Sequence, residues 1–516
     1  MRRLFANRYL LGLLVVMAVA AEFGLASVSH SAAITDGQRA PGQPRAVVST
    51  VVRACPGPGS AGATASAVAL AAASTGTGQA KVTRLTPSGA ATAPAPLHVL
   101  TQPGRLSVLN VPQAPVLARG LARQSTTATA AGVPTGAGRG GVMIEASGAM
   151  ARGLEAEQTN AGGLATAECQ GPGTDFWFVG PGQKSAANIQ LYLMNTDAQA
   201  ADATVSVLTD SGPIIGSTDA GIEVPPHGLV VQSLATLLKG SRVVSLNVTT
   251  SVGRVVAAVL DTSNTNEPGA WLPAAQPPAT TQVLPGLPGT PGGRELYVAV
   301  PGSGNAEVKV TAVTGKGSYQ PTGGNGIDLP GGSAVAVSLP SLGGIPAAIV
   351  VSSNVPVTAS MSTPGGAAGA PGAFTVAATP VQEQGLVTGN PAGTVGSSEL
   401  VLSAPQSAAR VQVSELTAAG QSGVTFGTVQ LGAGHTAVVP LPVPKQGGRG
   451  STFAVVITPL AGSGPVYAGR VVTSNGSVRS ILPVTSALTW VPLPTVHDSV
   501  TTALPATSGE RGSGRP

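Results

Sequence analysis

A short order of strands and turns recurs four times along this chain. Each copy predicts a strand, a turn, a second strand, a strand pair marked by proline or glycine, and two closing strands. Residues 188–194 and 399–403 fit the opening strand, and residues 203–208 and 409–414 fit the second strand. Successive copies begin about a hundred residues apart, which is the size of a domain and too long for a propeller blade or a solenoid coil. The chain is therefore expected to fold into serial β units.

The internal pattern of these units predicts their architecture. Apolar residues alternate with small or polar ones, which indicates strands with one buried and one wetter face. Six or seven short strands per unit predict an all-β fold of immunoglobulin-like β-sandwiches, although the Cys–Trp–Cys core of true immunoglobulin domains is absent. For the alanine-rich stretch 61–73 a helix remains an alternative to a strand, because alanine disfavours strands. By residue number, we expect a signal or anchor segment at 1–30, a linker at 31–44, β-sandwich units at 45–172, 173–285, 286–390 and 391–495, and a disordered tail at 496–516.

The low charge content of the chain limits the classes of molecule that it is expected to bind. Charged residues make up only 9% of the chain, against about a quarter in ordinary domains. The 70 glycines and 44 prolines agree with many short strands joined by turns. The formal net charge of +5 is spread thinly, and no basic run contains interleaved aromatic residues. Nucleic acid is therefore not an expected partner.

The N-terminus predicts export. Arg2, Arg3 and Arg8 precede an apolar run at 10–21, which is the pattern of a signal peptide. The run can continue to residue 28 and so reach membrane-spanning length, but Glu22 interrupts it. A cleaved signal and an uncleaved anchor both remain open. Either one places the residues after 33 outside the cytoplasm, in a protein that is secreted or held in the cell membrane by a single pass.

Cys55 and Cys169 are the two cysteines of the chain, and their settings are similar: Cys-Pro-Gly-Pro-Gly and Cys-Gln-Gly-Pro-Gly. An exported location favours a disulfide between them. Two cysteines with no histidine close in sequence make a poor metal site. We therefore predict a disulfide here and no metal ligands.

Few motifs suggest catalysis or a cofactor. Residues 57–62 match G-x-G-x-x-G, but Pro58 removes a backbone amide, and no acidic residue follows at the distance that a dinucleotide site requires. No histidine pair has the spacing of a helical zinc site, and no G-x-S-x-G or S-x-x-K motif occurs. We therefore expect no catalytic, cofactor-binding or metal-binding residues, and a protein that is not an enzyme.

Acidic residues concentrate in the second predicted unit. A carboxylate pair would suit a glycan-acting enzyme, and a carboxylate cluster would suit calcium. Turn formation is the third interpretation, because aspartate favours turns. The residues are Asp175, Asp197, Asp202, Asp210, Asp219, Glu223, Asp261 and Glu267.

The same unit holds a local excess of aromatic residues, in a chain with only 3% of them. Exposed Trp and Tyr rings stack on sugars in many carbohydrate-binding modules, whereas buried rings pack in the core. Trp177, Tyr192 and Trp271 are therefore the candidate contacts for a ligand or partner. Exposure of Trp177 or Trp271 beside polar groups would favour binding, and burial of Trp177 would favour a scaffold.

The layout resembles an uncharacterised actinobacterial family, a domain of unknown function. The resemblance rests on Cys55-Pro-Gly-Pro, on Cys169 with Phe176-Trp-Phe-Val-Gly, and on Leu191-Tyr-Leu-Met-Asn, and it covers about residues 1–495. It implies one N-terminal anchor followed by secreted β units. Such proteins are often found beside a large membrane glycosyltransferase, which implies an envelope role by association and carries over no catalytic residues.

Together these features predict an exported, membrane-tethered, non-enzymatic scaffold or accessory protein of the cell envelope that supports glycan assembly. The expected partner is an envelope protein, with a membrane glycosyltransferase or a glycan as candidates. The first alternative is a carbohydrate-binding protein that uses the second unit. The second alternative is a glycan-acting enzyme with carboxylate catalysis.

Overall fold

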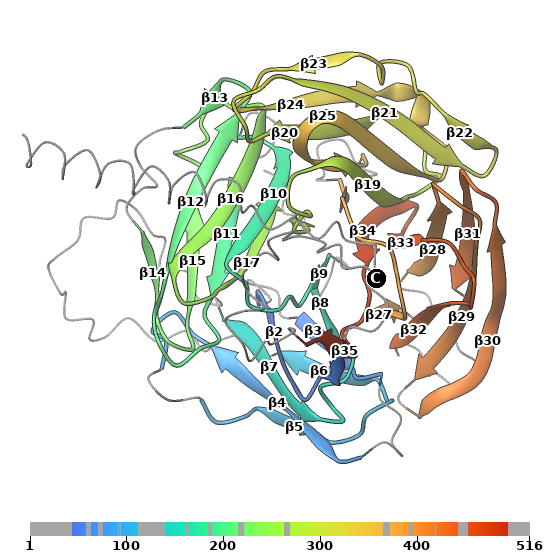
Figure 1. Cartoon of the computed structure of the whole chain (residues 1–516). Coiled ribbons are helices and arrows are strands. Elements are labelled where there is room, and N and C mark those ends of the chain that lie inside the picture. The colour runs from blue at the N-terminus through green and yellow to red at the C-terminus, as the bar shows by residue number, and fades with distance from the viewer. Residues whose placement is uncertain are drawn as a thin grey trace, which may run out of the picture. The chain divides into compact units, whose positions relative to one another are not determined.

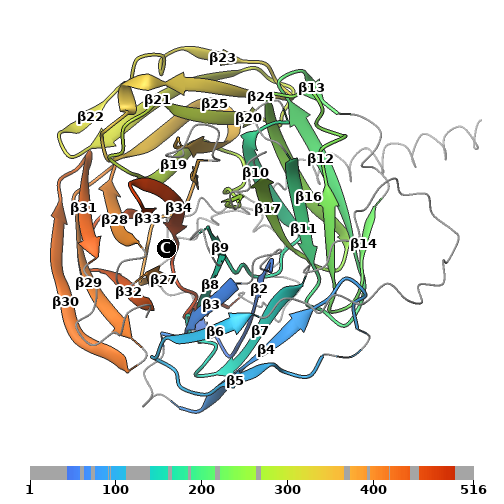
Figure 2. The same cartoon turned by 180° about the vertical axis from the view of Figure 1, so that it is seen from behind.

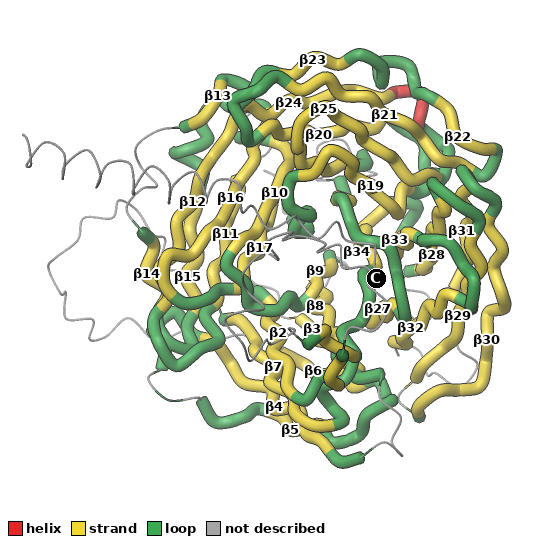
Figure 3. The backbone as a smooth tube through the Cα atoms, viewed as in Figure 1, coloured by secondary structure: helices red, strands yellow, loops and turns green. Residues whose placement is uncertain are grey.

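The fold is built from β-strands, as the computed structural model shows for residues 44–57, 63–70, 76–90, 92, 94–111, 140–160, 165–183, 188–214, 221–262, 269–364, 372–391, 396–417, 419–441 and 452–493. Among these residues, the one helical element is a short 3-10 turn, η2 (Pro340–Leu342) (Figure 3). The prediction of an all-β fold is confirmed. The predicted anchor at 1–30 and the predicted tail at 496–516 lie outside the described residues. Within the described part of the chain, no helix is long and apolar enough to cross a membrane.

Residues 47–489 form one compact unit that contains four β-sandwiches, which we call modules 1 to 4. In module 2, one sheet has the strand order β10-β16-β12-β13, with β14 also paired to β12, and the other has the order β15-β11-β17-β18 (Figures 1 and 2). The strands are β10 (Asp175–Pro181), β11 (Asn188–Met194), β12 (Ala201–Thr209), β13 (Gly212–Pro213), β14 (Ile222–Val224), β15 (Leu229–Ser233), β16 (Val243–Val252), β17 (Val256–Thr262) and β18 (Ala270–Leu272). Alternate residues of β12, namely Ala203, Val205 and Val207, are buried in the core between the sheets.

Module 1 repeats this strand order, with sheets β2-β7-β4-β5 and β6-β3-β8-β9. Its strands are β2 (Thr50–Cys55), β3 (Ala63–Val68), β4 (Gly78–Leu85), β5 (His98–Leu100), β6 (Ser107–Val111), β7 (Gly141–Gly148), β8 (Glu155–Asn160) and β9 (Thr166–Glu168). The alanine-rich stretch therefore contains a strand, because β3 pairs with β6 on one side and β8 on the other. Pairing on both edges overrides the weak strand preference of alanine.

Module 4 has the same order again, with sheets β27-β32-β29-β30 and β31-β28-β33-β34. Its strands are β27 (Gly385–Pro391), β28 (Ser397–Ala404), β29 (Ala409–Thr417), β30 (Gly420–Leu431), β31 (His435–Leu441), β32 (Thr452–Pro459), β33 (Tyr467–Ser474) and β34 (Ser477–Val484). In module 4, for example, β27 precedes the predicted opening strand, and β34 follows the predicted closing strands.

Module 3 differs in one strand. β25 (Ala347–Ser362) is long enough to serve both sheets: its first part pairs with β19 and β21, and its last part pairs with β20 and β26. The other strands are β19 (Ala279–Leu287), β20 (Arg294–Val300), β21 (Ala306–Thr314), β22 (Gly317–Tyr319), β23 (Ile327–Leu329), β24 (Ser333–Leu339) and β26 (Phe374–Val376). The predicted unit boundaries at 285/286 and 390/391 fall inside β19 and β27.

The first and last described strands, β1 (Arg45–Val47) and β35 (Trp490–Pro492), pair only with each other within the described chain. They belong largely to a second, small unit that comprises residues 1–46 and 490–516.

Within residues 47–489, consecutive modules meet through small groups and backbone hydrogen bonds. Between modules 1 and 2, the Ala90 N–H donates to the Pro226 carbonyl at 2.7 Å. Between modules 2 and 3, the Ser360 hydroxyl donates to the Val179 carbonyl. Between modules 3 and 4, Gly286 lies so close to Gly469 that a Cβ on Gly469 would stand 2.4 Å from the Gly286 Cα. The close approach of Gly286 and Gly469 leaves no room for a larger side chain at position 469.

Candidate functional site

Two of the three predicted aromatic contacts lie in the protein core. The rings of Tyr192 (β11) and Trp271 (β18) meet edge to face, with centroids 5.3 Å apart. They are only 3% and 7% exposed, and they pack in one apolar cluster with Ala54 and Leu85 of module 1. Edge-to-face packing of this kind stabilises a core. Their role in this structure is to join modules 1 and 2, and neither ring lies open to solvent.

Trp177 on β10 is half-buried. Its indole N–H donates to the Asp175 carboxylate at 3.3 Å, and the Asn247 amide donates to the same carboxylate. Of the three predicted contacts, Trp177 is the one that retains partial exposure beside polar groups.

The acidic residues of module 2 serve separate local contacts. Asp197 forms a two-pronged ion pair with Arg254, at 2.8 and 3.1 Å. Asp210 accepts a hydrogen bond from the Arg242 backbone N–H at 3.0 Å. Asp219 and Glu267 lie outside the described residues. Among the described residues, no group of three His, Cys, Asp or Glu side chains has the geometry to hold a metal ion.

Asp261 is the exception, because it is buried at the contact between modules 2 and 3. It lies on β17, is 7% exposed, and lines a cavity with Phe178 and Phe374. One carboxylate oxygen has no hydrogen-bond partner. Burial raises the pKa of Asp261 to about 7. A cavity of about 10 Å³ beside it has room for no more than about one water molecule.

A second group of charged side chains, which are buried or half-buried, is the most unusual chemical feature of the described chain, and we call it the seam cluster. It lies where module 1 meets module 4. Its members are Arg53 on β2, Glu155 and Glu157 on β8, Glu168 on β9 and Arg470 on β33.

Two ion pairs organise this cluster. Arg53 contacts Glu155 at 2.7 Å and also donates to the Leu154 carbonyl at 3.2 Å, so this pair closes module 1 internally. Arg470 contacts Glu157 at 2.7 Å, and its side chain is fully buried. Burial raises the pKa values of Glu155 and Glu157, and their arginine partners oppose that shift.

The Glu157–Arg470 pair is supported on both sides. The Thr388 N–H of module 4 donates to Glu157 at 2.8 Å, and Arg470 donates to the Thr388 carbonyl at 3.0 Å. One residue of module 1 is thus held by the backbone and a side chain of module 4. Charge-assisted hydrogen bonds that are shielded from water are stronger than neutral ones.

Glu168 is the third carboxyl of the cluster and lies directly opposite Glu157 in the β8–β9 pairing. Like charges at directly opposed positions destabilise a strand pair. Burial is the main reason that the pKa of Glu168 rises to about 7, and the neighbouring carboxylates Glu155 and Glu157 raise it further against the effect of Arg53. The cluster therefore combines two glutamates that are paired with arginines and a third that has no arginine of its own and a raised pKa.

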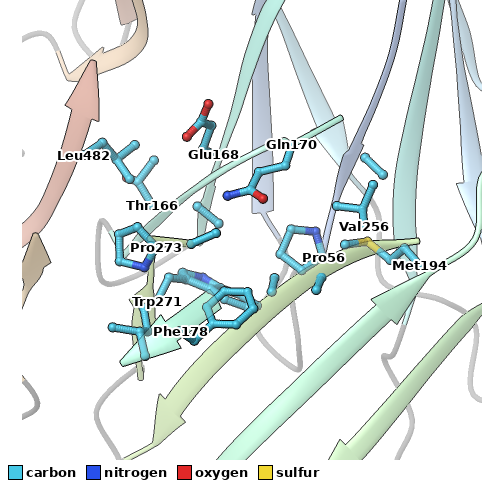
Figure 4. A pocket seen from close by; sticks show the side chains of 16 residues that line it. Pro56, Thr166, Glu168, Gln170, Phe178, Met194, Val256, Trp271, Pro273 and Leu482 are labelled. Carbon is cyan, nitrogen blue, oxygen red and sulfur yellow. The ribbon is translucent and has the colours of Figure 1, made fainter. Parts of the chain in front are cut away.

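Glu168 lies at the wall of two small cavities. In Figure 4, Glu168 and Gln170 lie across one cavity from Phe178 and Trp271. The other cavity lies between β8 and the ends of β27 and β34. Each has a volume of about 20 Å³, enough for one or two water molecules and far below the several hundred Å³ of typical ligand sites.

The seam cluster has the chemical groups of an acid–base site but lacks space for a substrate. A protonated carboxyl beside an ionised one is the arrangement used in glycoside hydrolysis. Here Glu155 is already bound to Arg53 within module 1, and Glu157 is bound to Arg470 across a closed seam. The arrangement is suited to holding modules 1 and 4 together, and the raised pKa of Glu168 makes the charge of the cluster depend on pH.

This cluster was not predicted from the sequence. The predicted acidic candidates were those of the second unit, whereas the buried Glu155 and Glu157 and the half-buried Glu168 precede Cys169 in the first. A usable signal was present: with so few charged residues in the chain, Glu155 and Glu157 alternate on a strand and Glu168 adjoins a disulfide cysteine. Arg470 is distant from these glutamates in sequence, so its contact with Glu157 is visible only in the folded structure.

Comparison with known proteins gives one match. A family model described as a family of unknown function (DUF5719) matches residues 122–442. The match includes modules 2 and 3 in full and the three glutamates of the seam cluster, and it ends before Arg470. No curated protein and no solved structure matches the chain.

Proposed function

The chain belongs to the DUF5719 family of unknown function, and from this premise we propose that it is an exported, membrane-tethered, non-enzymatic scaffold of the cell envelope. One observation carries the proposal. The seam cluster is used to tie module 4 to module 1, and the cavities beside it admit water rather than a sugar.

Other features support the same proposal. A disulfide joins Cys55 to Cys169, which confirms the predicted pairing and agrees with an oxidising location. The positively charged, apolar N-terminal sequence is typical of export. The resemblance to actinobacterial proteins found beside a large membrane glycosyltransferase supports such an enzyme as the partner. In this proposal the protein assists envelope glycan assembly by binding that enzyme.

Of the three aromatic residues predicted to bind a carbohydrate, only one remains a candidate in module 2. Tyr192 and Trp271 are buried, so a sugar platform would have to rest on Trp177. Because Trp177 already hydrogen-bonds to Asp175, we favour the scaffold.

Export gives the first prediction. A reporter that works only outside the cytoplasm, fused after Asp36, should be active, because Arg2, Arg3 and Arg8 hold the N-terminus inside and residues 34 onward lie outside. A reporter that works only in the cytoplasm, fused at the same place, should be inactive. The opposite pattern would reject the membrane-tethered arrangement. Whether residues 1–30 are retained is decided by N-terminal sequencing of the mature protein.

Partner binding gives the second prediction. The full chain, captured from detergent-solubilised envelopes, should retain a membrane glycosyltransferase. Single replacements Asp197→Asn, Asp210→Asn and Glu223→Gln should leave both capture and the melting temperature nearly unchanged, since isolated surface substitutions usually alter stability by less than about 0.5 kcal/mol. If one of these folded variants abolishes function, a catalytic role for the module 2 acids is restored. If no glycosyltransferase is retained, the proposed partner is wrong.

A further inference from the structure

The contact between modules 4 and 1 differs from the other seams because no short chain segment closes it. Modules 1, 2, 3 and 4 follow one another with short connections from β9 to β10, from β18 to β19 and from β26 to β27. Module 4 reaches module 1 only through non-covalent contacts between residues far apart in sequence. These include Glu157 with Arg470 and the Leu106 N–H with the Thr417 carbonyl at 3.1 Å. This seam can open without straining a connection.

The charges at this seam do not balance when all of them are ionised. Three carboxyls, on β8 and β9, face two guanidinium groups, on β2 and β33. Each guanidinium already pairs with a different glutamate, namely Glu155 or Glu157. The remaining cavity walls, from β17, β18, β27 and β34, contribute no charged side chain. Ionised Glu168, which is half-buried, therefore adds a negative charge directly opposite Glu157 without an arginine of its own.

From this geometry we propose that the seam between modules 4 and 1 is a proton-controlled clasp. It is closed while Glu168 is protonated, and it loosens when Glu168 becomes ionised. The consequence is a conformational change within residues 47–489 that lies beyond the scaffold role and does not depend on the identity of any partner.

The direction of the pH effect follows from the shift at Glu168. Its pKa in the folded protein is about 7, above its ordinary value of 4.5. The stabilising contribution is therefore fully present below about pH 4.5 and is lost as the pH rises through about 7. Between about pH 4.5 and 7, the ratio of open to closed seam should grow by up to about tenfold per pH unit. Above about pH 7 it should level off, because Glu168 is then ionised in both states.

Asp261 provides an internal comparison. Its pKa is also about 7, but it lies at the contact of modules 2 and 3, which the chain connects directly. Ionisation of Asp261 should weaken that contact locally. It should leave the pH response of β8, β9 and β27 unchanged.

The test is hydrogen exchange of the full chain between pH 4.5 and 8.5, with rates divided by the intrinsic rate at each pH. Protection of β8, β9 and β27 should fall by up to about tenfold per pH unit between about pH 5 and 6.5 in the natural protein and level off above about pH 7. In Glu168→Gln, a neutral group of the same shape, protection should stay constant. Two controls, Glu145→Gln at an exposed site on β7 and Asp261→Asn, should respond like the natural protein.

Three results would overturn the clasp. One is constant protection of this seam in the natural protein, and another is an unchanged pH response in Glu168→Gln. The third is failure of both Glu168→Gln and Glu168→Leu to fold, because a residue that is neutral in the closed state should tolerate a neutral replacement. A rise of the carboxylate infrared band between pH 6 and 8, present in the natural protein and missing in Glu168→Gln, is the direct readout of the titration.

Discussion

Replacing Arg470 by alanine is expected to lower the free energy of unfolding of residues 47–489 by about 3–5 kcal/mol. The guanidinium is fully buried, and its partner Glu157 is nearly so. Removal of Arg470 leaves the buried Glu157 with hydrogen bonds from Thr388 but without a positive partner. The loss arises mainly from this uncompensated buried charge, and chemical denaturation followed by circular dichroism measures it.

A double replacement separates the charge effect from loss of packing. Arg470→Met combined with Glu157→Gln removes both charges while retaining most of the side-chain volume. This variant should recover most of the stability, since replacing both members of a buried pair is often neutral. The matched control is Arg254→Ala, whose pair with Asp197 is 51% and 34% exposed. That control should cost less than about 1 kcal/mol. Equal losses for Arg470→Ala and Arg254→Ala would contradict the assignment of the seam.

The repeated β plan is the part of the fold that local sequence predicts best. Strand β12 alternates apolar and polar residues, and turns with glycine follow it, so both its existence and its buried face can be deduced. Strand β27 was missed for a physical reason. All seven of its residues are buried, and its Gly, Asn and Pro residues are typical of turns. A strand without alternation and with turn-forming residues cannot be distinguished from a loop by periodicity.

The seam cluster was beyond local reasoning for a different reason. Glu157 and Arg470 come from modules at opposite ends of the described chain, so their contact depends on the arrangement of all four modules. The aromatic residues illustrate the same limit: sequence identified Trp271, but its burial follows from module 1 packing against module 2. The predicted disulfide succeeded because a chain with only two cysteines offers a single intramolecular pairing.

Loss of that disulfide is the other change with a large expected effect. Cys55 ends β2 in one sheet of module 1, and Cys169 follows β9 in the other sheet, so the bond links the two sheets. The Ala54 N–H donates to the Gln170 carbonyl at 2.8 Å directly beside it. The bond closes a loop with a sequence separation of 114 residues. In the chain-entropy model, a loop of this size contributes about 4–5 kcal/mol by restricting the unfolded chain.

Cys55→Ala with Cys169→Ala should therefore unfold at a clearly lower denaturant concentration than the natural protein. The effect should also reach module 2, because Ala54 packs in the same cluster as Trp271. In a background with Trp177→Phe and Trp490→Phe, fluorescence of Trp271 should report the loss as a red-shifted emission at denaturant concentrations where the disulfide-bonded form is unchanged. Reduction of the disulfide-bonded protein in the same background should reproduce that curve. If the reduced and oxidised forms unfold together, module 1 is held by its strand pairing and the seam cluster, and the disulfide adds little to its stability.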